Sequence, residues 1–141
     1  MTFIIGIENP KHKENLGTLW RSAFQMGACS IFSIGRPYQP QYSDTYKTWK
    51  LIPYFAYDVI ESFIIPRDFV LVGIEQGGYD LRKFTHPERA IYLLGNESHG
   101  LTSKAKDRCH QIVSIPSIRA NSYNVAVAGS LCMYDRMVKE N

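Results

Sequence analysis

Five short apolar segments, separated by stretches with helical spacing, constrain the fold of this chain more than any other feature. Each segment is mostly apolar and rich in β-branched and aromatic residues, which suits strands that are covered on both faces of a parallel sheet. Because strands alternate with helices, we predict an α/β fold with a mainly parallel sheet and helices on both faces. The predicted strands are Phe3–Ile7, Ser30–Ile34, Phe69–Ile74, Ala90–Gly95 and Gln111–Pro116.

Two helices are predicted from the spacing of apolar residues. The first spans Leu16–Met26, with Asn15 as its N-cap and Gly27 as the glycine that ends it. The last spans Asn124–Val138, and its first half is apolar almost all round, which indicates burial in the core or against another subunit. Gly129 inside it indicates tight packing, because glycine within a helix costs about 1 kcal/mol relative to alanine. The apolar stripe of the first helix comprises Leu16, Leu19, Trp20, Ala23 and Phe24.

Length and composition fit one globular domain over residues 1–141. Apolar residues make up 45% of the chain and charged residues 21%, and no apolar run approaches the ~20 residues of a membrane span. The apolar start lacks a basic lead, so we interpret it as a first strand rather than a signal peptide. The three cysteines are widely spaced and form no C-x-x-C pair. We therefore expect no disulfide framework and no zinc site, but reduced thiols in a cytoplasmic protein.

The segment 35–55 differs in residue composition from the rest of the chain. It interleaves Arg36, Lys47 and Lys50 with four tyrosines and Trp49. Basic side chains pair with phosphates and aromatic rings stack on bases, so the pattern is typical of a nucleic-acid surface. A long loop with a short helix that caps the core explains the same segment equally well, and both interpretations stay open.

Three polar loops at strand ends carry the candidate chemistry, at residues 14–21, 94–101 and 115–129. In open α/β sheets ligands bind beyond the carboxyl ends of the strands, so the three loops could converge on one site. Each loop also has an ordinary explanation as a helix cap or a solvated turn. Several familiar sites are disfavoured, because the chain has no G-x-G-x-x-G or P-loop glycine motif, no G-x-S-x-G around Ser122, and no metal-ligand spacing around His99.

Taken together, the three loops resemble the three motifs of the SpoU (TrmH-like) RNA ribose 2′-O-methyltransferases of the SPOUT superfamily. The first family motif, Asn-x-Gly-x-x-x-Arg, matches Asn15, Gly17 and Arg21. The second, Leu/Phe-Gly-Asn/Pro-Glu-x-x-Gly-Leu, matches residues 94–101. The third, Ile-Pro and then Ser-Leu-Asn-Val-Ser before an apolar helix, matches part of residues 115–126.

The order and separation of these motifs match over nearly the whole chain, and the chain resembles the minimal single-domain members without an RNA-binding extension. Three positions depart from the family pattern. Tyr123 replaces the usual Leu, Ala126 replaces a common Ser, and Arg119 lies where many members have Gly. The change at Arg119 puts the contacts of this loop with RNA or cofactor in doubt.

The resemblance implies a deep C-terminal trefoil knot, which composition could not indicate because true knots are nearly absent from proteins. It implies S-adenosyl-L-methionine bound in the knot, and a homodimer with the site near the subunit interface. The implied reaction is methyl transfer to a ribose 2′-hydroxyl of tRNA or rRNA, without a metal or a membrane. The alternative is a non-catalytic RNA-binding module with the same fold.

The resemblance also assigns residues to roles, with Arg21, Asn15 and Glu97 as the catalytic set. Arg21 would position the hydroxyl and stabilise negative charge on its oxygen, because a guanidinium stays protonated and cannot serve as a base. Glu97 would orient Arg21, while Asn15 would fix the first loop or contact the ribose. The cofactor would bind at Gly73, Ile74, Leu94, Gly95, Ile115, Ser122, Tyr123 and Asn124, and RNA at Arg21, Arg36, Lys47 and Arg119.

Overall fold

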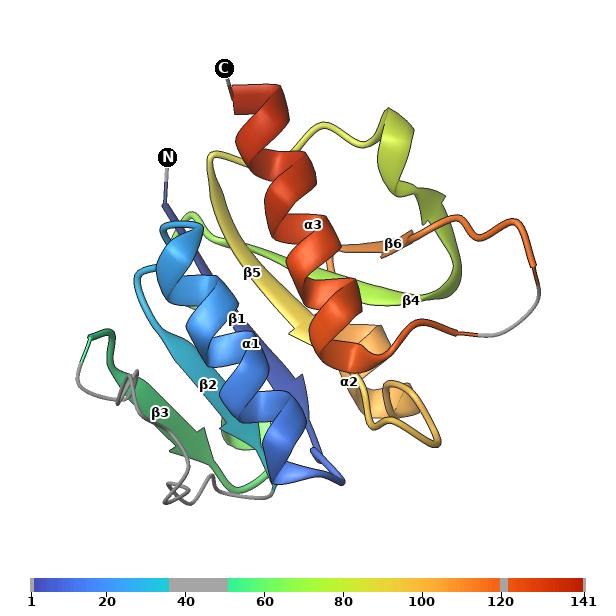
Figure 1. Cartoon of the computed structure of the whole chain (residues 1–141). Helices are drawn as coiled ribbons and strands as arrows, with labels where there is room; N and C mark the ends of the chain where they lie inside the picture. The colour runs from blue at the N-terminus through green and yellow to red at the C-terminus, as the bar shows by residue number, and fades with distance from the viewer. Residues whose placement is uncertain (1, 36–50, 120–121, 141) are drawn as a thin grey trace.

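The computed structural model describes residues 2–35, 51–119 and 122–140, and a six-stranded sheet forms its centre. The strand order is β3-β2-β1-β5-β4-β6, and all neighbouring strands are parallel (Figure 1). The predicted α/β fold with a parallel sheet is confirmed. The strands are β1 (Thr2–Glu8), β2 (Ile31–Ile34), β3 (Tyr54–Tyr57), β4 (Val70–Asp80), β5 (Arg89–Leu94) and β6 (Gln111–Ser114).

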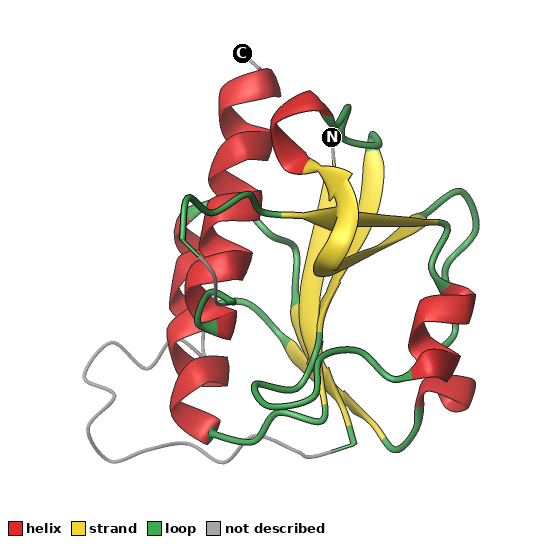
Figure 2. Cartoon of the chain, turned by 90° about the vertical axis from the view of Figure 1, so that its right-hand side faces the viewer, coloured by secondary structure: helices red, strands yellow, loops and turns green. Residues whose placement is uncertain are grey.

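Helices cover both faces of this sheet. The helices α1 (Lys13–Gln25) and α3 (Val125–Glu140) lie side by side on one face, and α2 (Ser103–Arg108) lies on the other (Figure 2). Two apolar clusters fill the two layers. Successive buried residues of β5 alternate between the clusters, because side chains along a strand point to opposite faces. The prediction that the strands are buried on both sides is confirmed for β1, β2, β5 and the first half of β4, but β6 is an edge strand that buries only Val113 fully.

Three elements differ from their predicted form. The edge strand β3 begins at the end of the segment 35–55, where only a loop and a short helix were expected. The helix α2 was not predicted, and it is only six residues long. Strand β4 continues past Ile74 to Asp80, but its pairing with β6 is interrupted by a bulge between Ile74 and Tyr79. This bulge forms part of a cavity wall described below.

The structure confirms the predicted C-terminal end of α1 but not its predicted N-cap. The predicted C-terminal glycine is confirmed, since Gly27 has φ of 91° and follows the last helical turn. The predicted N-cap at Asn15 is wrong, because the helix begins at Lys13 and His12 takes the cap position. Phe24 is 43% exposed although the apolar stripe predicted its burial.

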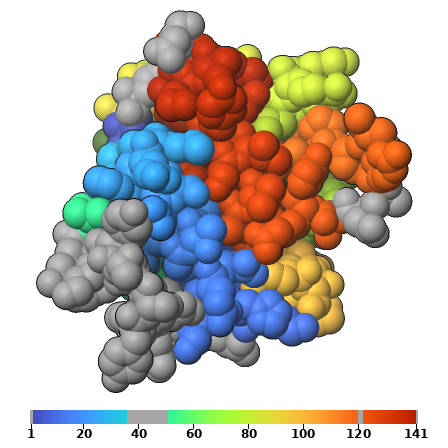
Figure 3. Space-filling model, viewed as in Figure 1, coloured from blue at the N-terminus to red at the C-terminus, as the bar shows by residue number. Residues whose placement is uncertain are grey.

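The helix α3 packs closely on one side and presents apolar side chains on the other. A Cβ atom added to Gly129 would lie 2.4 Å from Leu19 Cδ1 and 2.9 Å from Leu94 Cδ1, so the predicted tight packing is confirmed. Large apolar residues recur along the opposite side of α3, and α1 and α3 form one continuous face in Figure 3. The exposed large apolar residues of α3 are Val127, Leu131, Tyr134, Met137 and Val138.

A buried polar network anchors the C-terminal half of α3 to the start of β5. Arg136 is 1% exposed and donates to the Tyr92 hydroxyl at 2.9 Å, so the Tyr92 proton points to His86 Nδ1 at 2.6 Å. His86 then carries its own proton on Nε2 and donates it to Asp135 at 2.7 Å. Burial lowers the pKa of His86 and outweighs the opposing effect of Asp135, so the neutral ring fits this network.

Candidate functional site

The three predicted loops meet at one end of the molecule. The carboxyl ends of β1 and β5 and the amino-terminal ends of α1 and α3 lie there together (Figure 1). Asn15 Nδ2 donates to Glu97 Oε2 at 2.8 Å, and Asn124 Nδ2 donates to Asn15 Oδ1 at 3.0 Å. One residue from each loop therefore belongs to a single hydrogen-bonded chain, which we call the Glu97–Asn15–Asn124 chain.

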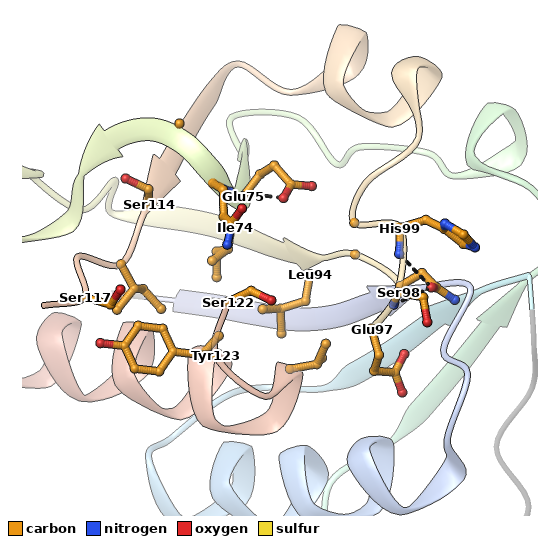
Figure 4. Close-up of a pocket in the computed structure, with 18 residues that line it drawn as sticks. Ile74, Glu75, Leu94, Glu97, Ser98, His99, Ser114, Ser117, Ser122 and Tyr123 are labelled. Carbon is orange, nitrogen blue, oxygen red and sulfur yellow. Dashed lines mark hydrogen bonds between the residues drawn. The ribbon is translucent and has the colours of Figure 1, made fainter. Parts of the chain in front are cut away.

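Glu97 anchors the loop between β1 and α1. Its two carboxylate oxygens accept the backbone N–H groups of Lys11 and His12 at 2.9 and 2.8 Å, besides the amide of Asn15. Partial burial raises the pKa of Glu97, but these three donors outweigh it and hold the pKa below its ordinary value. In Figure 4 the Glu97 side chain points toward α1. These contacts of Glu97 fix the first loop, and the predicted role of Glu97 toward Arg21 stays a prediction.

Asn124 is the N-cap of α3. Its Oδ1 accepts the N–H groups of Ala126 at 2.9 Å and Val127 at 3.2 Å, which satisfies two donors of the first helical turn. Its Nδ2 is left to bind Asn15. The orientation of the amide is thereby determined, because reversing it would turn the NH2 group toward backbone donors.

The turn after β5 is tightened around two glycines. Gly100 has φ of 71°, a conformation that side chains disfavour. A Cβ atom at Gly95 would lie 2.2 Å from the carbonyl carbon of Gly100, so the backbone strands of the turn touch directly. Asn96 Oδ1 accepts the N–H groups of Ser98 and His99 at 2.7 and 3.0 Å. These contacts brace the turn from Gly95 to Gly100, which we call the glycine rim, beside a cavity.

A cavity of about 580 Å³ lies beyond the ends of β4, β5 and β6 (Figure 4), within the size range of small-molecule sites. Apolar side chains and glycine backbone form its floor, and serines and acidic residues form its walls. Six of the eight residues predicted to hold the cofactor line it: Ile74, Leu94, Gly95, Ile115, Ser122 and Tyr123.

The other two predicted cofactor residues lie elsewhere. Gly73 packs in the opposite layer, where an added Cβ would lie 2.8 Å from the Cys109 sulfur and 2.9 Å from Leu101. Asn124 lines a second hollow between α1 and α3 together with Asn15. Gly73 therefore provides room for packing, and Asn124 lies between two lining residues, Tyr123 and Val125, with its own side chain bound to Asn15.

A comparison with protein families agrees with this geometry. The model of the SpoU rRNA Methylase family matches residues 2–134. The chain belongs to the SpoU family. The predicted resemblance is confirmed, and the family fold implies the C-terminal trefoil knot.

Relatives and solved structures support the same assignment. A 23S rRNA (uridine(2479)-2′-O)-methyltransferase of Streptomyces viridochromogenes is 30% identical over 91% of this chain, and the match covers 50% of that protein. A 23S rRNA (guanosine-2′-O-)-methyltransferase RlmB of Bordetella pertussis is 31% identical over 49% of this chain and 29% of its own length. The chain thus spans half or less of these SpoU relatives.

Two solved structures share the fold over almost the whole chain. The SpoU methyltransferase AviRb from Streptomyces viridochromogenes superposes with a TM-score of 0.87 at 23% identity, covering 98% of this chain and 59% of AviRb. A protein studied for 2-OH methylation of C/U34 on tRNA superposes with a TM-score of 0.84 at 22% identity. That match covers 99% of this chain and 98% of the other, so the two chains have about the same size.

The structure describes two of the four residues predicted to contact RNA. Arg21 is exposed on α1, six residues beyond Asn15, and Arg119 is exposed in the loop before α3. Neither is among the described residues that line the cavity. Arg36 and Lys47 lie outside the described residues. The prediction that these residues contact RNA stays a prediction.

Sequence reasoning missed the bulge of β4 as a wall of the SpoU cavity. Glu75, Gln76 and Gly77 line the cavity, with Ser114 and Ser117 from the β6 side. A signal was present, because the polar run Glu75-Gln76 and two glycines directly follow an apolar strand. Lys11 and His12 were also missed, because they act through backbone N–H groups, which every residue except proline has.

A metal site and a membrane span are both absent from the described residues. No three His, Cys, Asp or Glu side chains gather there as a possible metal site. No helix in the described part of the chain has the length and apolarity needed to cross a membrane.

Proposed function

We propose that this chain transfers a methyl group from S-adenosyl-L-methionine to a ribose 2′-hydroxyl of RNA. The observation that carries the proposal is the Glu97–Asn15–Asn124 chain, which ties three distant motif loops together beside a ligand-sized cavity. Relatives named as rRNA 2′-O-methyltransferases support the reaction class. A non-catalytic RNA-binding module would have no need for the cavity and its glycine rim.

The lining of the cavity fits the proposed cofactor. AviRb has been solved in complex with AdoMet, and it shares this fold with a TM-score of 0.84. In this chain Leu94, Ile115 and Tyr123 offer apolar contact, and Gly95 lets a ligand approach the backbone. When bound, the cofactor supplies a sulfonium with a transferable methyl group. The protein's own task is to hold the donor, bring in the acceptor hydroxyl and stabilise its oxygen.

We assign Arg21 to the acceptor side of the reaction. Its guanidinium cannot take the hydroxyl proton, but it can bind a phosphate in bidentate fashion and stabilise charge that develops on the 2′-oxygen. Because α1 begins beside Glu97, the Glu97–Asn15–Asn124 chain sets the position of α1, and with it Arg21, relative to the cavity. Glu97 and Asn15 are positioning residues in this proposal.

The RNA is proposed as tRNA or rRNA. The net charge of +3 and exposed Lys11, Lys13 and Arg119 near the motif loops suit a phosphate backbone. An enzyme that acts on RNA of this kind would act in the cytoplasm. The exposed thiol of Cys29 is compatible with such a reducing compartment.

A homodimer formed through the α1–α3 face completes the proposal. Val127, Leu131, Tyr134 and Val138 follow one side of α3 and are between 38% and 53% exposed. Phe24 of α1 adds to this surface. An apolar stripe of that length on an outer helix face is typical of a protein interface. Leu131→Asp should convert a dimer to a monomer in light scattering, whereas a monomeric native chain would contradict the dimer.

The function is tested with the purified chain, radiolabelled S-adenosylmethionine and RNA from cells that lack the gene. We expect label in a ribose 2′-O-methyl group with the native chain. Arg21→Ala should lose transfer by at least a hundredfold while its affinity for the cofactor, measured by calorimetry, changes less than about threefold. Loss of transfer and cofactor binding together would contradict the role of Arg21. Binding of RNA without any cofactor binding would favour the non-catalytic module.

A further inference from the structure

Glu75 places a carboxylate in the wall of the cavity. It follows the last paired residue of β4 before the bulge, and it is half-buried. Its Oε2 accepts the N–H of Leu101 at 2.7 Å, and its Oε1 accepts the N–H of Gln76 at 3.0 Å. In Figure 4 the side chain lies above Leu94 and extends toward the turn that carries His99. Two backbone donors therefore orient this carboxylate.

The same carboxylate is matched to the glycine rim. A Cβ atom at Gly100 would lie 2.3 Å from Glu75 Oε2 and 3.0 Å from both the carboxyl carbon and Oε1. Only a glycine at position 100 leaves room for Glu75 to reach the N–H of Leu101. The bulge of β4 and the turn after β5 are fitted to each other through this contact.

Glu75 keeps more hydrogen-bonding capacity than Glu97, and it keeps one free position on each oxygen. Each carboxylate oxygen can accept about two hydrogen bonds, and each oxygen of Glu75 has one backbone donor. Glu97 is the other carboxylate among the described lining residues, but three donors from the first loop and α1 occupy it. The described lining contains no lysine or arginine. Glu75 therefore offers two adjacent acceptor positions to a ligand.

We propose that Glu75 accepts hydrogen bonds from the 2′- and 3′-hydroxyls of the cofactor's ribose, and so selects a ribonucleoside ligand. Two oxygens held at fixed positions match two neighbouring hydroxyl donors, as the carboxylate of a dinucleotide site matches a ribose hydroxyl. The inference rests on the proposed function, since it assumes a nucleoside cofactor in this cavity. It makes Glu75 a specificity-determining residue outside the three motif loops.

Calorimetry can test this without any turnover. The ligands are S-adenosylhomocysteine and its 2′-deoxy and 3′-deoxy analogues, and the proteins are the native chain and Glu75→Ala. In the native chain each missing hydroxyl should raise Kd about tenfold, the usual effect of losing a hydrogen bond to a charged group. In Glu75→Ala the same loss should change Kd less than about threefold. Glu75→Gln repeats the comparison with a side chain of native size if the alanine variant does not fold.

Glu61→Gln is the matched control, because it removes one negative charge from an exposed 3₁₀ turn that does not line the cavity. It should behave as the native chain with all three ligands. If Glu75→Ala weakens all three ligands by one common factor, Glu75 is only a brace and the inference fails. It also fails if Glu75→Ala weakens S-adenosylmethionine but not S-adenosylhomocysteine, since the carboxylate would then respond to the sulfonium. A native chain that binds neither nucleoside overturns the proposed function itself.

Discussion

Asn124→Asp separates the two tasks of Asn124 without a change of size. The Oδ1 that caps α3 is kept, and Asp is as good an N-cap as Asn. The amide donor that binds Asn15 Oδ1 becomes a second carboxylate oxygen, so two acceptors face each other. Asn15 cannot rescue the contact by turning its amide, because its oxygen would then face Glu97 Oε2.

The magnitude follows from these contacts. The lost hydrogen bond is worth about 1 kcal/mol, and the opposed acceptors add a comparable penalty that solvent reduces because Asn124 is exposed. The negative charge near the helix N-terminus returns about 0.5 kcal/mol. We therefore expect Asn124→Asp to lower the free energy of unfolding by about 1 kcal/mol at pH 7. The loop at Ser122 and Tyr123 should loosen, and the affinity for S-adenosylmethionine should fall a few-fold.

Urea unfolding followed by circular dichroism measures the effect, in the native chain and in an Asn15→Ala background. In that background the facing oxygen is gone, so Asn124→Asp should become neutral or slightly stabilising. Asn124→Asp in a Thr18→Ala background is the control, because Thr18 is an exposed residue one turn further along α1. An equal effect in all three backgrounds, within about 0.4 kcal/mol, would refute the coupling of the first and third loops.

Three further predictions concern packing, the glycine rim and pH. Gly129→Val should lower the free energy of unfolding by at least about 2 kcal/mol in urea titrations, because the new side chain meets the fully buried Leu19; unchanged stability would contradict the packing of α3. Gly100→Ala should weaken cofactor binding in calorimetry more than tenfold, since it combines φ of 71° with a contact against Glu75. Stability should fall as the pH drops below about 6.5, because the lowered pKa of His86 lets the unfolded chain bind a proton first; His86→Gln, less stable at pH 7.5, should lose that part of the slope in urea midpoints measured from pH 7.5 to 5.

The strands could be predicted because a strand buried on both faces is a run of consecutive apolar residues. Every strand covered on both faces was found within about two residues of its start, and ends differed where pairing changes. The edge strand β3 could not be found, since it pairs with β2 alone and Phe55 is 50% exposed. The helix α2 buries only Ala105, so its six residues carry no apolar period.

The convergence of the three loops could be predicted as well, because parallel strands place their carboxyl ends at one edge. The hydrogen-bond partners of the residues within the site could not be predicted. Asn15 and Glu97 are separated by 82 residues, and a polar residue at a helix start equally fits a cap. The bulge of β4 could not be predicted because the apolar run of the strand stops at Ile74. The contact of Glu75 with Leu101 could not be predicted either, because it depends on a backbone N–H.

The motif side chains are largely engaged with one another, which bears on how the chemistry is divided. Glu97 binds the first loop, Asn15 bridges Glu97 to Asn124, and Asn124 caps α3. Side chains so engaged set geometry, and a ligand that displaced one would leave its partners unsatisfied. In the proposed reaction we therefore assign these three side chains to geometry, Arg21 on α1 to the methyl acceptor, and Glu75 with the glycine rim to the donor. A variant of the Glu97–Asn15–Asn124 chain should accordingly impair the alignment of the two sides, lowering the rate of transfer more than the affinity for either ligand.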